Sequence, residues 1–382
     1  MWHASGDMDS ALVVGAGTFG ASLAWLMARE GVAVTLIDQF DPGDARATSG
    51  GESRLYRCAH GAEEGYTRSA HRARTLWREL EAATGEELLL ERGVAWFAHR
   101  LDGWEAASER AMRAQAIPVE RLEVAEAARM FPSFQGEDLE FVLLEYEAGA
   151  IRAARAVQAL VRAAEAEGAR VKQERAVPAG AGVELSDGSR LEAGVVVWAC
   201  GGWLRDLFPG LVTLRVTRQE LLFLDGGPAW GEPSVPCWVD YDAAAYGTSD
   251  VDGLGVKIAP DVEGPPLDPD AELPPVTAEG EAAARDYARL RFPALADAPL
   301  AGGKTCRYEL SPDSNFIVAP HPSEPGVWLV GGGSGHGFKH GPAIAERLLG
   351  AIRGTDELPV AFGLGERQPG RSFRTAGSNA YT

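Results

Sequence analysis

The stretch Ala11-Leu-Val-Val-Gly-Ala-Gly-Thr-Phe-Gly20 decides the fold, because it leads a short apolar strand directly into three glycines with G-x-G-x-x-G spacing. Residues 21–30 follow with strong helix formers and no proline, and Gly31 stands where such a helix would end. The β-branched run from Val32 to Asp38 predicts a second buried strand that ends in an acid. Together these segments predict a βαβ unit that binds a dinucleotide.

Each glycine of this motif has a physical role. Gly15 makes the tight turn, Gly17 lets the backbone approach a pyrophosphate, and Gly20 lets the helix pack closely on the strand. Free N–H groups at the helix N-terminus favour the phosphates, and Asp38 is placed to accept a hydrogen bond from a ribose hydroxyl. The alternative is a glycine-rich turn that binds no nucleotide, and the complete strand–helix–strand context disfavours it.

The composition narrows the classes of partner. The chain has 382 residues with 36 Lys and Arg against 55 Asp and Glu, a formal net charge of −19, so we expect neither nucleic acid nor an anionic membrane as a partner. Glycines interrupt the uncharged run of residues 11–28, and we expect no membrane span. Four cysteines without C-x-x-C spacing fit a reducing compartment, so we expect a cytoplasmic protein.

Beyond the opening unit, the periodicity predicts a mixture of helices and strands. The predicted helices cover residues 63–83, 153–168, 277–290 and 343–349. The apolar run Val195 to Trp198 predicts a buried strand that returns to the first sheet. Residues 211–224 and 235–258, with their β-branched and aromatic side chains, predict an antiparallel sheet, while five prolines make residues 264–275 a surface loop.

Five segments carry a wider resemblance, and together they span most of the chain. They are the glycine motif at 15–20, Gly51-Glu-Ser-Arg-Leu-Tyr-Arg57, residues 195–203, Lys304-Thr-Cys-Arg-Tyr-Glu-Leu-Ser-Pro-Asp313 and Gly335-His-Gly-Phe-Lys339. In these segments the chain resembles the D-amino-acid-oxidase-like flavoprotein superfamily, and within it the monomeric sarcosine oxidase and N-methyltryptophan oxidase group. The last two segments are the specific ones.

The resemblance implies a mixed α/β fold with two domains. One is a Rossmann-like FAD-binding domain of the p-hydroxybenzoate-hydroxylase type, and the second is an antiparallel-sheet domain that faces the substrate. We expect a discontinuous FAD-binding domain of residues 8–85, 145–212 and 302–382. Residues 86–144 and 213–301 would form the substrate domain.

The resemblance also implies a reaction. A secondary amino acid, such as sarcosine or another N-methyl or cyclic amino acid, would transfer hydride to flavin N5, and water would hydrolyse the imine. Oxygen would then be reduced to hydrogen peroxide. The partners would be a small amino acid and O2, and the protein would be a monomer. Two alternatives stay open: an FAD-dependent amino acid dehydrogenase that uses another electron acceptor, and a non-catalytic flavin-binding protein.

The resemblance assigns a set of cofactor-binding residues. They are Gly15, Gly17, Gly20, Asp38, Gly201, Cys306, Gly335, His336, Gly337 and Lys339. Cys306 falls where the group carries a thioether bond to the C8 methyl of its flavin, and Arg307 beside it could help to ionise the thiol. The alternative for Cys306 is a small buried hydrophobic residue, which is what we expect of Cys58, Cys200 and Cys237.

Four cations and a tyrosine complete the expected active site. Arg57 and Lys339 match the positions that bind the substrate carboxylate, where Arg offers a two-pronged donor and Lys a point charge. Lys257 matches the lysine that promotes oxygen reduction, and Arg54 an arginine near the flavin ring. Tyr246 matches an active-site tyrosine that touches substrate. The alternatives are solvated surface charges and, for Tyr246, an ordinary core tyrosine.

The chain departs from close sarcosine oxidases at three places. Ser49-Gly50 stands where they have paired histidines, Asp261 where they have an active-site histidine, and Glu309 where they have a smaller polar residue. An added carboxylate near the ring favours a more cationic substrate or a different amine than sarcosine.

Two further motifs near the C-terminus resemble a metal site and a hydrolase motif. His336 and His340 have the spacing of two metal ligands on a helix, but Gly341 and Pro342 argue against a regular helix and no third ligand is evident, so we expect no metal. Residues 332–336 resemble a hydrolase nucleophile elbow, but end in His where the motif requires Gly.

Overall fold

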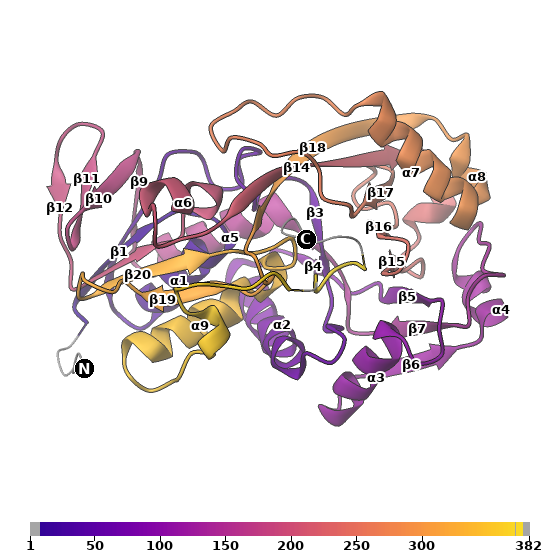
Figure 1. Ribbon diagram of the computed structural model, residues 1–382, viewed down its shortest axis with the longest axis horizontal. Helices are drawn as coiled ribbons and strands as arrows, with labels where there is room; N and C mark the ends of the chain where they lie inside the picture. The colour runs from indigo at the N-terminus through magenta and orange to yellow at the C-terminus, as the bar shows by residue number, and fades with distance from the viewer. Residues whose placement is uncertain (1–7, 371, 377–382) are drawn as a thin grey trace.

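A six-stranded, largely parallel sheet forms one end of the molecule, on the left in Figure 1. The computed structural model describes residues 8–370 and 372–376. In sheet order the strands are β19 (Ile317–Pro320), β20 (Val327–Gly331), β13 (Val195–Trp198), β1 (Ser10–Val14), β2 (Ala33–Asp38) and β9 (Arg170–Gln173). Only β19, at one edge, runs antiparallel to its neighbour. The predicted βαβ unit and the return of residues 195–198 to the same sheet are therefore confirmed.

Different layers cover the two faces of this sheet. The helices packed together on one side are α1 (Thr18–Arg29), α2 (Glu64–Thr84), α5 (Ala153–Ala166) and α9 (Gly341–Ile352). The elements whose apolar side chains pack on the other side are β10 (Ala176–Ala179), β11 (Gly182–Leu185), β12 (Arg190–Leu191) and α6 (Leu204–Leu207). Parallel strands need such cover, because both of their faces are apolar.

An eight-stranded sheet forms the other end. In sheet order it contains β18 (Leu300–Leu310), β14 (Arg215–Leu224), β17 (Val256–Pro260), β16 (Ala245–Thr248), β15 (Cys237–Asp240), β5 (Val94–Ala98), β7 (Phe141–Glu145) and β6 (Val119–Leu122). All pairs are antiparallel except β15 with β5. The mixed α/β fold with a second, mainly antiparallel sheet is thus confirmed, and the domain boundaries stay a prediction.

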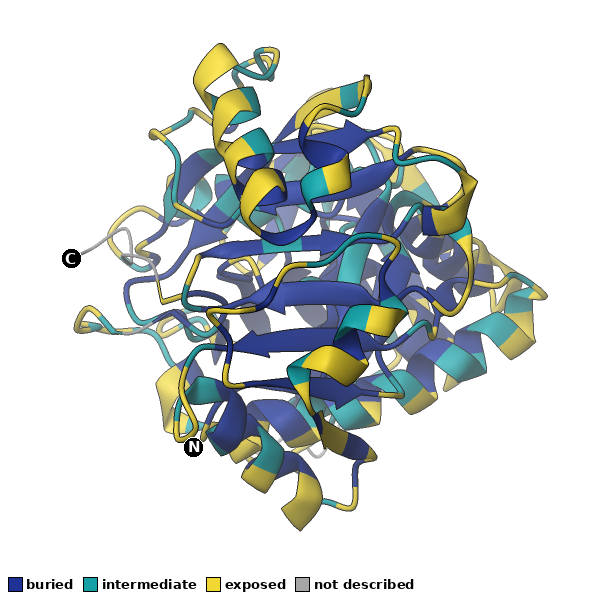
Figure 2. Cartoon of the chain, turned by 90° about the vertical axis from the view of Figure 1, so that its right-hand side faces the viewer, coloured by how far each residue is buried: buried dark blue, intermediate teal, exposed yellow. Residues whose placement is uncertain are grey.

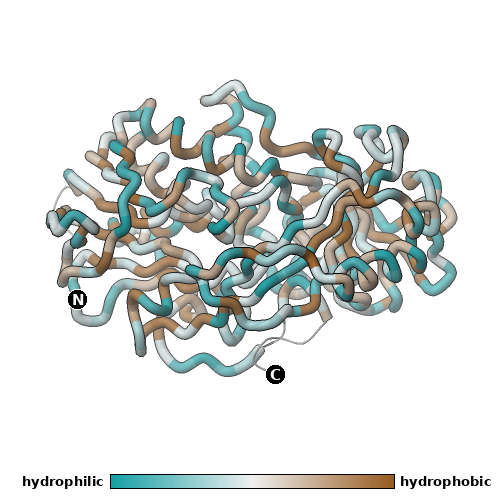
Figure 3. The backbone as a smooth tube through the Cα atoms, turned by 90° about the horizontal axis from the view of Figure 1, so that it is seen from above, coloured by the Kyte–Doolittle hydropathy of each residue, from teal (hydrophilic) through white to brown (hydrophobic). Residues whose placement is uncertain are grey.

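Helices α7 (Ala278–Arg291) and α8 (Pro293–Ala296) cover one face of the second sheet. Thr277 caps α7, as its side chain accepts a hydrogen bond from Gly280 N at 3.1 Å. Figure 2 shows this end of the molecule, with buried strands inside and helices that expose only their outer faces. In Figure 3 hydrophobic stretches run through both ends of the molecule, as expected for separate cores under each sheet.

Short elements connect the two large sheets. A three-stranded sheet contains β3 (Ser53–Tyr56), β8 (Gly149–Arg152) and β4 (Leu89–Leu90). The remaining elements are α3 (Trp104–Ala114), α4 (Val124–Ala127), and the 3₁₀ helices η1 (Ala128–Met130), η2 (Gly201–Trp203), η3 (Pro228–Gly231), η4 (Phe338–His340) and η5 (Val360–Phe362). Among the described residues, every helix is too short or too polar to cross a membrane.

One helix begins earlier than its sequence suggested. We expected this helix over residues 343–349, but α9 already begins at Gly341 and Pro342. Proline is well suited to the first turn, where its missing N–H has no partner to lose. A Cβ on Gly341 would lie 2.2 Å from Thr18 Oγ1, so the glycine is needed for close packing of α9 against α1.

Gly20 offers a direct test of the packing of α1 on the sheet. A Cβ at this position would lie 1.9 Å from the Gly15 carbonyl oxygen, a backbone atom that cannot move aside. We expect Gly20→Ala to lower the free energy of unfolding by about 1–3 kcal/mol or more, measured by urea denaturation. Gly65→Ala is the matched control, because Gly65 lies in α2 with open space around its Cα; it should raise stability by up to about 1 kcal/mol. Equal effects of the two substitutions would contradict this packing.

Candidate active site

The glycine turn brings backbone from two neighbouring strands close together. Gly15 has φ +104°, and a Cβ there would lie 2.3 Å from the carbonyl oxygen of Ala199. Gly17 is the N-cap of α1 and supplies no side-chain cap. The first residues of the helix line the pocket. Among their backbone N–H groups, that of Thr18 donates to a side chain, Ser49 Oγ, at 3.0 Å. Such an end favours an anion.

Asp38 at the end of β2 holds this turn in place. Its carboxylate accepts hydrogen bonds from Ala16 N at 2.6 Å and Phe40 N at 2.8 Å. Burial raises the pKa of Asp38, and these backbone hydrogen bonds oppose the rise. The carboxylate lines the same pocket as Gly15 and Gly17, so its remaining acceptor capacity is available to a ribose.

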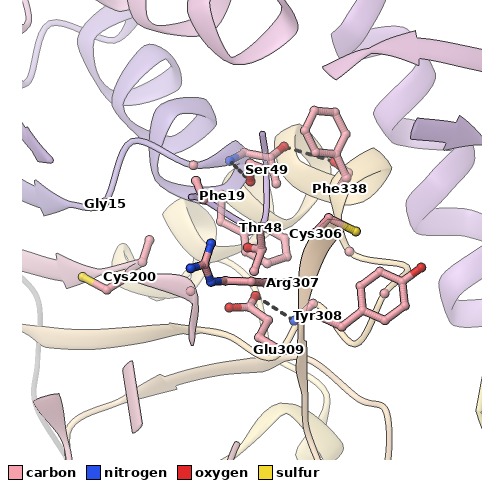
Figure 4. A pocket seen from close by; sticks show the side chains of 18 of the residues that line it. Gly15, Phe19, Thr48, Ser49, Cys200, Cys306, Arg307, Tyr308, Glu309 and Phe338 are labelled. Carbon is pink, nitrogen blue, oxygen red and sulfur yellow. Dashed lines mark hydrogen bonds between the residues drawn. The ribbon is translucent and has the colours of Figure 1, made fainter. Parts of the chain in front are cut away.

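Most of the expected residues line one pocket, part of which is drawn in Figure 4. They are Gly15, Gly17, Asp38, Arg54, Arg57, Gly201, Tyr246, Cys306, Gly335, His336, Gly337 and Lys339. Two expected residues are not in its lining. Gly20 packs behind the turn, and Lys257 lies buried on β17 with its Nζ 3.1 Å from the Ser53 carbonyl oxygen. The pocket thus extends from the dinucleotide motif to the second sheet.

The four expected cations share an unusual environment. Their N–H groups donate to backbone carbonyl oxygens. Arg54 donates to the carbonyls of Ser53, Thr48 and Gly50, and Arg57 donates to those of Ala59 and Phe373. Lys257 donates to the carbonyl of Ser53, and Lys339 donates to that of His336. Within residues 8–370 and 372–376, none of the four forms an ion pair. These cations can therefore accept an anionic ligand without first losing a carboxylate partner.

Burial without a paired carboxylate moves the pKa values of Arg57, Lys257 and Lys339. The pKa of Arg57 falls to about 10 through burial, which the buried Glu145 partly offsets. Burial and, to a smaller extent, the charge of Arg54 together lower the pKa of Lys257 to about 7. Burial also lowers the pKa of Lys339 well below its ordinary value. An anion bound beside them would favour the charged forms again.

Cys306 lies on β18 with its sulfur on the side of Tyr308, whereas Arg307 and Glu309 point to the opposite side (Figure 4). Side chains alternate along a strand, so the adjacent Arg307 is not the main charge on the thiol. Burial raises the pKa of Cys306, and Arg54 and Lys257 oppose this more than Arg307 does. Arg307 does help to lower the pKa of the thiol, as expected, but Arg54 and Lys257, from two other strands, lower it more.

Glu309 is a buried carboxylate with an unused acceptor. Its Oε1 accepts from Gly333 N at 3.0 Å, while Oε2 is buried with no partner among the described residues. Burial raises the pKa of Glu309 to about 7. A Cβ on Gly201 would lie 3.0 Å from this oxygen, so it faces the glycine turn after β13, where a ligand hydroxyl or N–H would find an acceptor.

A polar network that the sequence did not suggest closes the far side of the pocket. The hydroxyls of Tyr246 and Tyr308 form a hydrogen bond at 3.4 Å, and the Tyr308 hydroxyl donates to the Asp261 carboxylate at 3.3 Å. Arg374, from the C-terminal segment, pairs with the Asp261 carboxylate. Burial raises the pKa of Asp261, and Arg374 opposes the rise. Nothing in the sequence around Arg374 indicated that it returns to the pocket.

Glu145 was also missed. It accepts hydrogen bonds from Cys58 N, from Ala59 N at 3.3 Å and from Trp96 Nε1 at 3.2 Å, and so fixes the segment that carries Arg57. The sequence did contain a signal for Glu145, because this charged residue ends the apolar strand β7. A buried carboxylate in such a place needs hydrogen-bond donors around it.

The structure corrects the expectation that His336 and His340 have no third histidine beside them. The sequence offered no further ligand to accompany His336 and His340, but the fold places His60 against both, with ring centroids 5.8 and 5.1 Å away. His60 is far from them in the sequence, so spacing could not reveal it.

The donor set fits FAD. The turn at Gly15 and Gly17 leaves room for backbone contact with a pyrophosphate, and α1 offers N–H groups to it. The unpartnered Glu309 oxygen offers an acceptor, and Arg54 and Lys339 offer positive charge farther along. An elongated, anionic dinucleotide with a polar ring satisfies all of these groups.

Comparison with known proteins agrees with this fit. Residues 10–350 match the DAO family, described as FAD dependent oxidoreductase. Monomeric sarcosine oxidase from Arthrobacter sp. (strain TE1826) is 27% identical over 374 residues, covering 92% of this chain and 94% of the relative. N-methyl-L-tryptophan oxidase from Yersinia pestis (strain Pestoides F) is 28% identical over 347 residues, covering 88% and 92%.

Solved structures share the fold. The L-proline dehydrogenase of P. horikoshii superposes with a TM-score of 0.80 at 20% identity, covering 93% of this chain and 97% of that one. NikD, an amino acid oxidase of nikkomycin biosynthesis, gives 0.76 at 22% identity, with the same coverage. Since the family match extends over most of the chain, the protein belongs to the DAO family of FAD-dependent oxidoreductases.

Proposed function

We propose that the protein is an FAD-dependent oxidase of secondary amino acids. The observation that carries this proposal is the pair Arg57 and Lys339, which line the pocket together with Cys306 and form no ion pair within the described chain. A substrate carboxylate would supply the missing anion. The names of the sarcosine and N-methyltryptophan oxidases to which the chain is similar support an N-methyl amino acid as the substrate class.

The chain's own residues would bind and orient the substrate. Arg57 offers a two-pronged donor and Lys339 a point charge to one carboxylate, while the aromatic ring of Tyr246 forms part of the wall. Bound FAD would accept the hydride at N5 and pass the electrons to oxygen, giving hydrogen peroxide. Lys257, behind the wall beside Cys306 and Tyr246, would hold positive charge near the site of oxygen reduction.

Of the two expectations, a more cationic substrate or a different amine than sarcosine, the positions of the two carboxylates favour the second. Asp261 is already paired with Arg374 and bonded by Tyr308. Glu309 points to the opposite side of β18 from Cys306 and is bonded to Gly333. We therefore infer a neutral or aromatic side chain on the substrate rather than a basic one.

A substrate panel tests the proposed activity. Peroxide release would be measured with sarcosine, N-methyl-L-tryptophan, proline, pipecolate and a glycated amino acid, each beside the corresponding primary amino acid. We expect at least one secondary amino acid to be oxidised much faster than its primary counterpart. Oxidation confined to primary amines would overturn the proposal, and flavin reduction without peroxide would favour the dehydrogenase.

We further propose that Cys306 holds the flavin covalently. If so, acid precipitation of the wild-type protein leaves the yellow colour in the pellet, and Cys306→Ala releases it to the supernatant, measured by absorbance. Cys237→Ala is the control, because Cys237 is a buried, free cysteine of the same sheet and is not in the pocket lining. Colour that leaves the wild-type protein on precipitation would contradict the attachment.

Arg57→Gln should weaken carboxylate binding. A charge-assisted hydrogen bond contributes about 1.5–3 kcal/mol, so the dissociation constant of a non-reactive carboxylate ligand should rise about ten- to a hundredfold, measured by flavin absorbance. Lys339→Met should act similarly. The exposed Arg155→Gln is the control, and unchanged binding in both pocket variants would refute the assignment.

The proposed role of Lys257 predicts a pH dependence. With a pKa lowered to about 7 by burial, the side chain is cationic below that pH and neutral above it, so its stabilisation of negative charge on oxygen is lost as pH rises. Reoxidation by O2, followed by stopped flow, should slow with rising pH in the wild type, and be slower and pH-independent in Lys257→Met. The exposed Lys172→Met is the control. A Lys257→Met variant that keeps the wild-type rate and pH profile would exclude the role.

A further inference from the structure

Three buried histidines from separate segments meet beside the pocket. His60 follows β3, His336 belongs to the glycine-rich turn after β20, and His340 ends η4. Their side chains are only 1%, 4% and 0% exposed. One ring nitrogen of each lies within 4.8 Å of the corresponding atoms of the other two. His336 also lines the pocket, whereas the proposed oxidation assigns no role to His60 or His340.

The hydrogen bonds fix which ring nitrogens of the cluster carry hydrogen and which have a free lone pair. His60 Nδ1 lies 3.0 Å from the Cys58 carbonyl oxygen, and His336 Nε2 lies 2.9 Å from that of Ser314. A carbonyl oxygen only accepts, so both nitrogens carry hydrogen, and the opposite nitrogens, His60 Nε2 and His336 Nδ1, present lone pairs. His340 Nδ1 is bonded to Ser69 Oγ at 3.0 Å, which leaves its Nε2 on the same side.

Protein groups alone leave this arrangement unsatisfied. His340 Nε2 can donate to His60 Nε2 at 3.3 Å, but His336 Nδ1 is buried with no partner among the described residues. An unmade hydrogen bond of a buried polar atom is costly. If His340 instead donates from Nδ1 to Ser69, each of the three rings has one lone pair free for a ligand.

We propose that His60, His336 and His340 bind a divalent first-row transition metal of the zinc type. Imidazole suits such ions, and the outer nitrogens of His60 and His336 are each held by a backbone carbonyl, the supporting contact that metal-binding histidines make. Three histidines would leave one position open for water or another small ligand.

The distances suit a tetrahedral ion. With zinc–nitrogen bonds of about 2.1 Å, two ligand nitrogens are about 3.4 Å apart, and His60 Nε2 and His340 Nε2 are already 3.3 Å apart. The ligand atoms of the three rings lie within 4.8 Å of one another, so His336 would move closer to the other two rings when an ion binds. Aromatic rings support the cluster, as Phe316 stacks on His336 at 4.7 Å and Tyr66 on His60 at 5.6 Å.

The ion would join two segments that carry pocket cations. His60 is three residues after Arg57, and His336 and His340 flank Lys339. A shared metal would therefore fix the distance between Arg57 and Lys339. This consequence rests on the proposed function, whereas metal binding itself does not, so an inactive protein that still binds zinc would overturn only the oxidase proposal.

Metal binding is measured on untagged, flavin-loaded protein after treatment with a chelator. Zn²⁺ would be titrated in competition with a chromophoric chelator, and metal content determined by mass spectrometry. We expect one equivalent of tightly bound Zn²⁺, and an increase in the dissociation constant of at least about a hundredfold in His60→Phe and His340→Phe. His71→Phe, in α2 outside the cluster, should bind as the wild type does.

Two results would overturn the proposal. One is the absence of stoichiometric Zn²⁺ binding by the wild type, and the other is unchanged affinity in the folded His60 and His340 variants. Should those variants fail to fold, Co²⁺ titration of the wild type decides, because tetrahedral imidazole ligation gives intense visible bands beyond the flavin absorption. No such bands would mean that the three histidines bind only one another.

Discussion

The rest of the structure depends on four cations that lie beside one pocket and have no carboxylate partner within the described residues; three are buried and Arg54 is half-buried. Arg54, Arg57, Lys257 and Lys339 direct their N–H groups to backbone carbonyl oxygens instead. Burial without a counter-ion is unfavourable and lowers the pKa values of Arg57 and both lysines. The site is therefore incomplete until an anion enters, and both a substrate carboxylate and an electron-rich cofactor ring supply negative charge. An acidic protein with a formal net charge of −19 thus places four cations beside one pocket.

The fold provides these carbonyl groups by bringing distant segments together. Strand β3 connects two of these cations, because the Ser53 carbonyl oxygen accepts hydrogen bonds from both Arg54 and Lys257. Lys257 belongs to the eight-stranded sheet. The segment after β3 is fixed by Glu145 through the N–H groups of Cys58 and Ala59, and the C-terminal segment returns to accept a hydrogen bond from Arg57 at the Phe373 carbonyl. Loss of any of these contacts would change where the cations lie.

Local sequence patterns predicted local structure well. The glycine motif, the helix predicted over residues 277–290 and the antiparallel sheet follow from spacing and residue type within short windows. Contacts between distant residues could not be predicted in this way. Arg307 is adjacent to Cys306 in sequence but points to the other side of the strand, while Arg54 acts on the thiol from another sheet. His60 and Arg374 reach their partners only through the fold, and position 341 needs a glycine because Thr18 of α1 is close by.

The central claim is that the unpaired cations of the pocket select a carboxylate. Anaerobic mixing tests it most directly, with flavin reduction followed for each reactive secondary amino acid and for the amine that lacks its carboxylate, such as N-methyl-L-tryptophan and N-methyltryptamine or proline and pyrrolidine. We expect reduction by the amino acid to be at least about a hundredfold faster at equal concentration, since two charge-assisted contacts are lost with the carboxylate. Equal rates with the two members of each pair would contradict the claim.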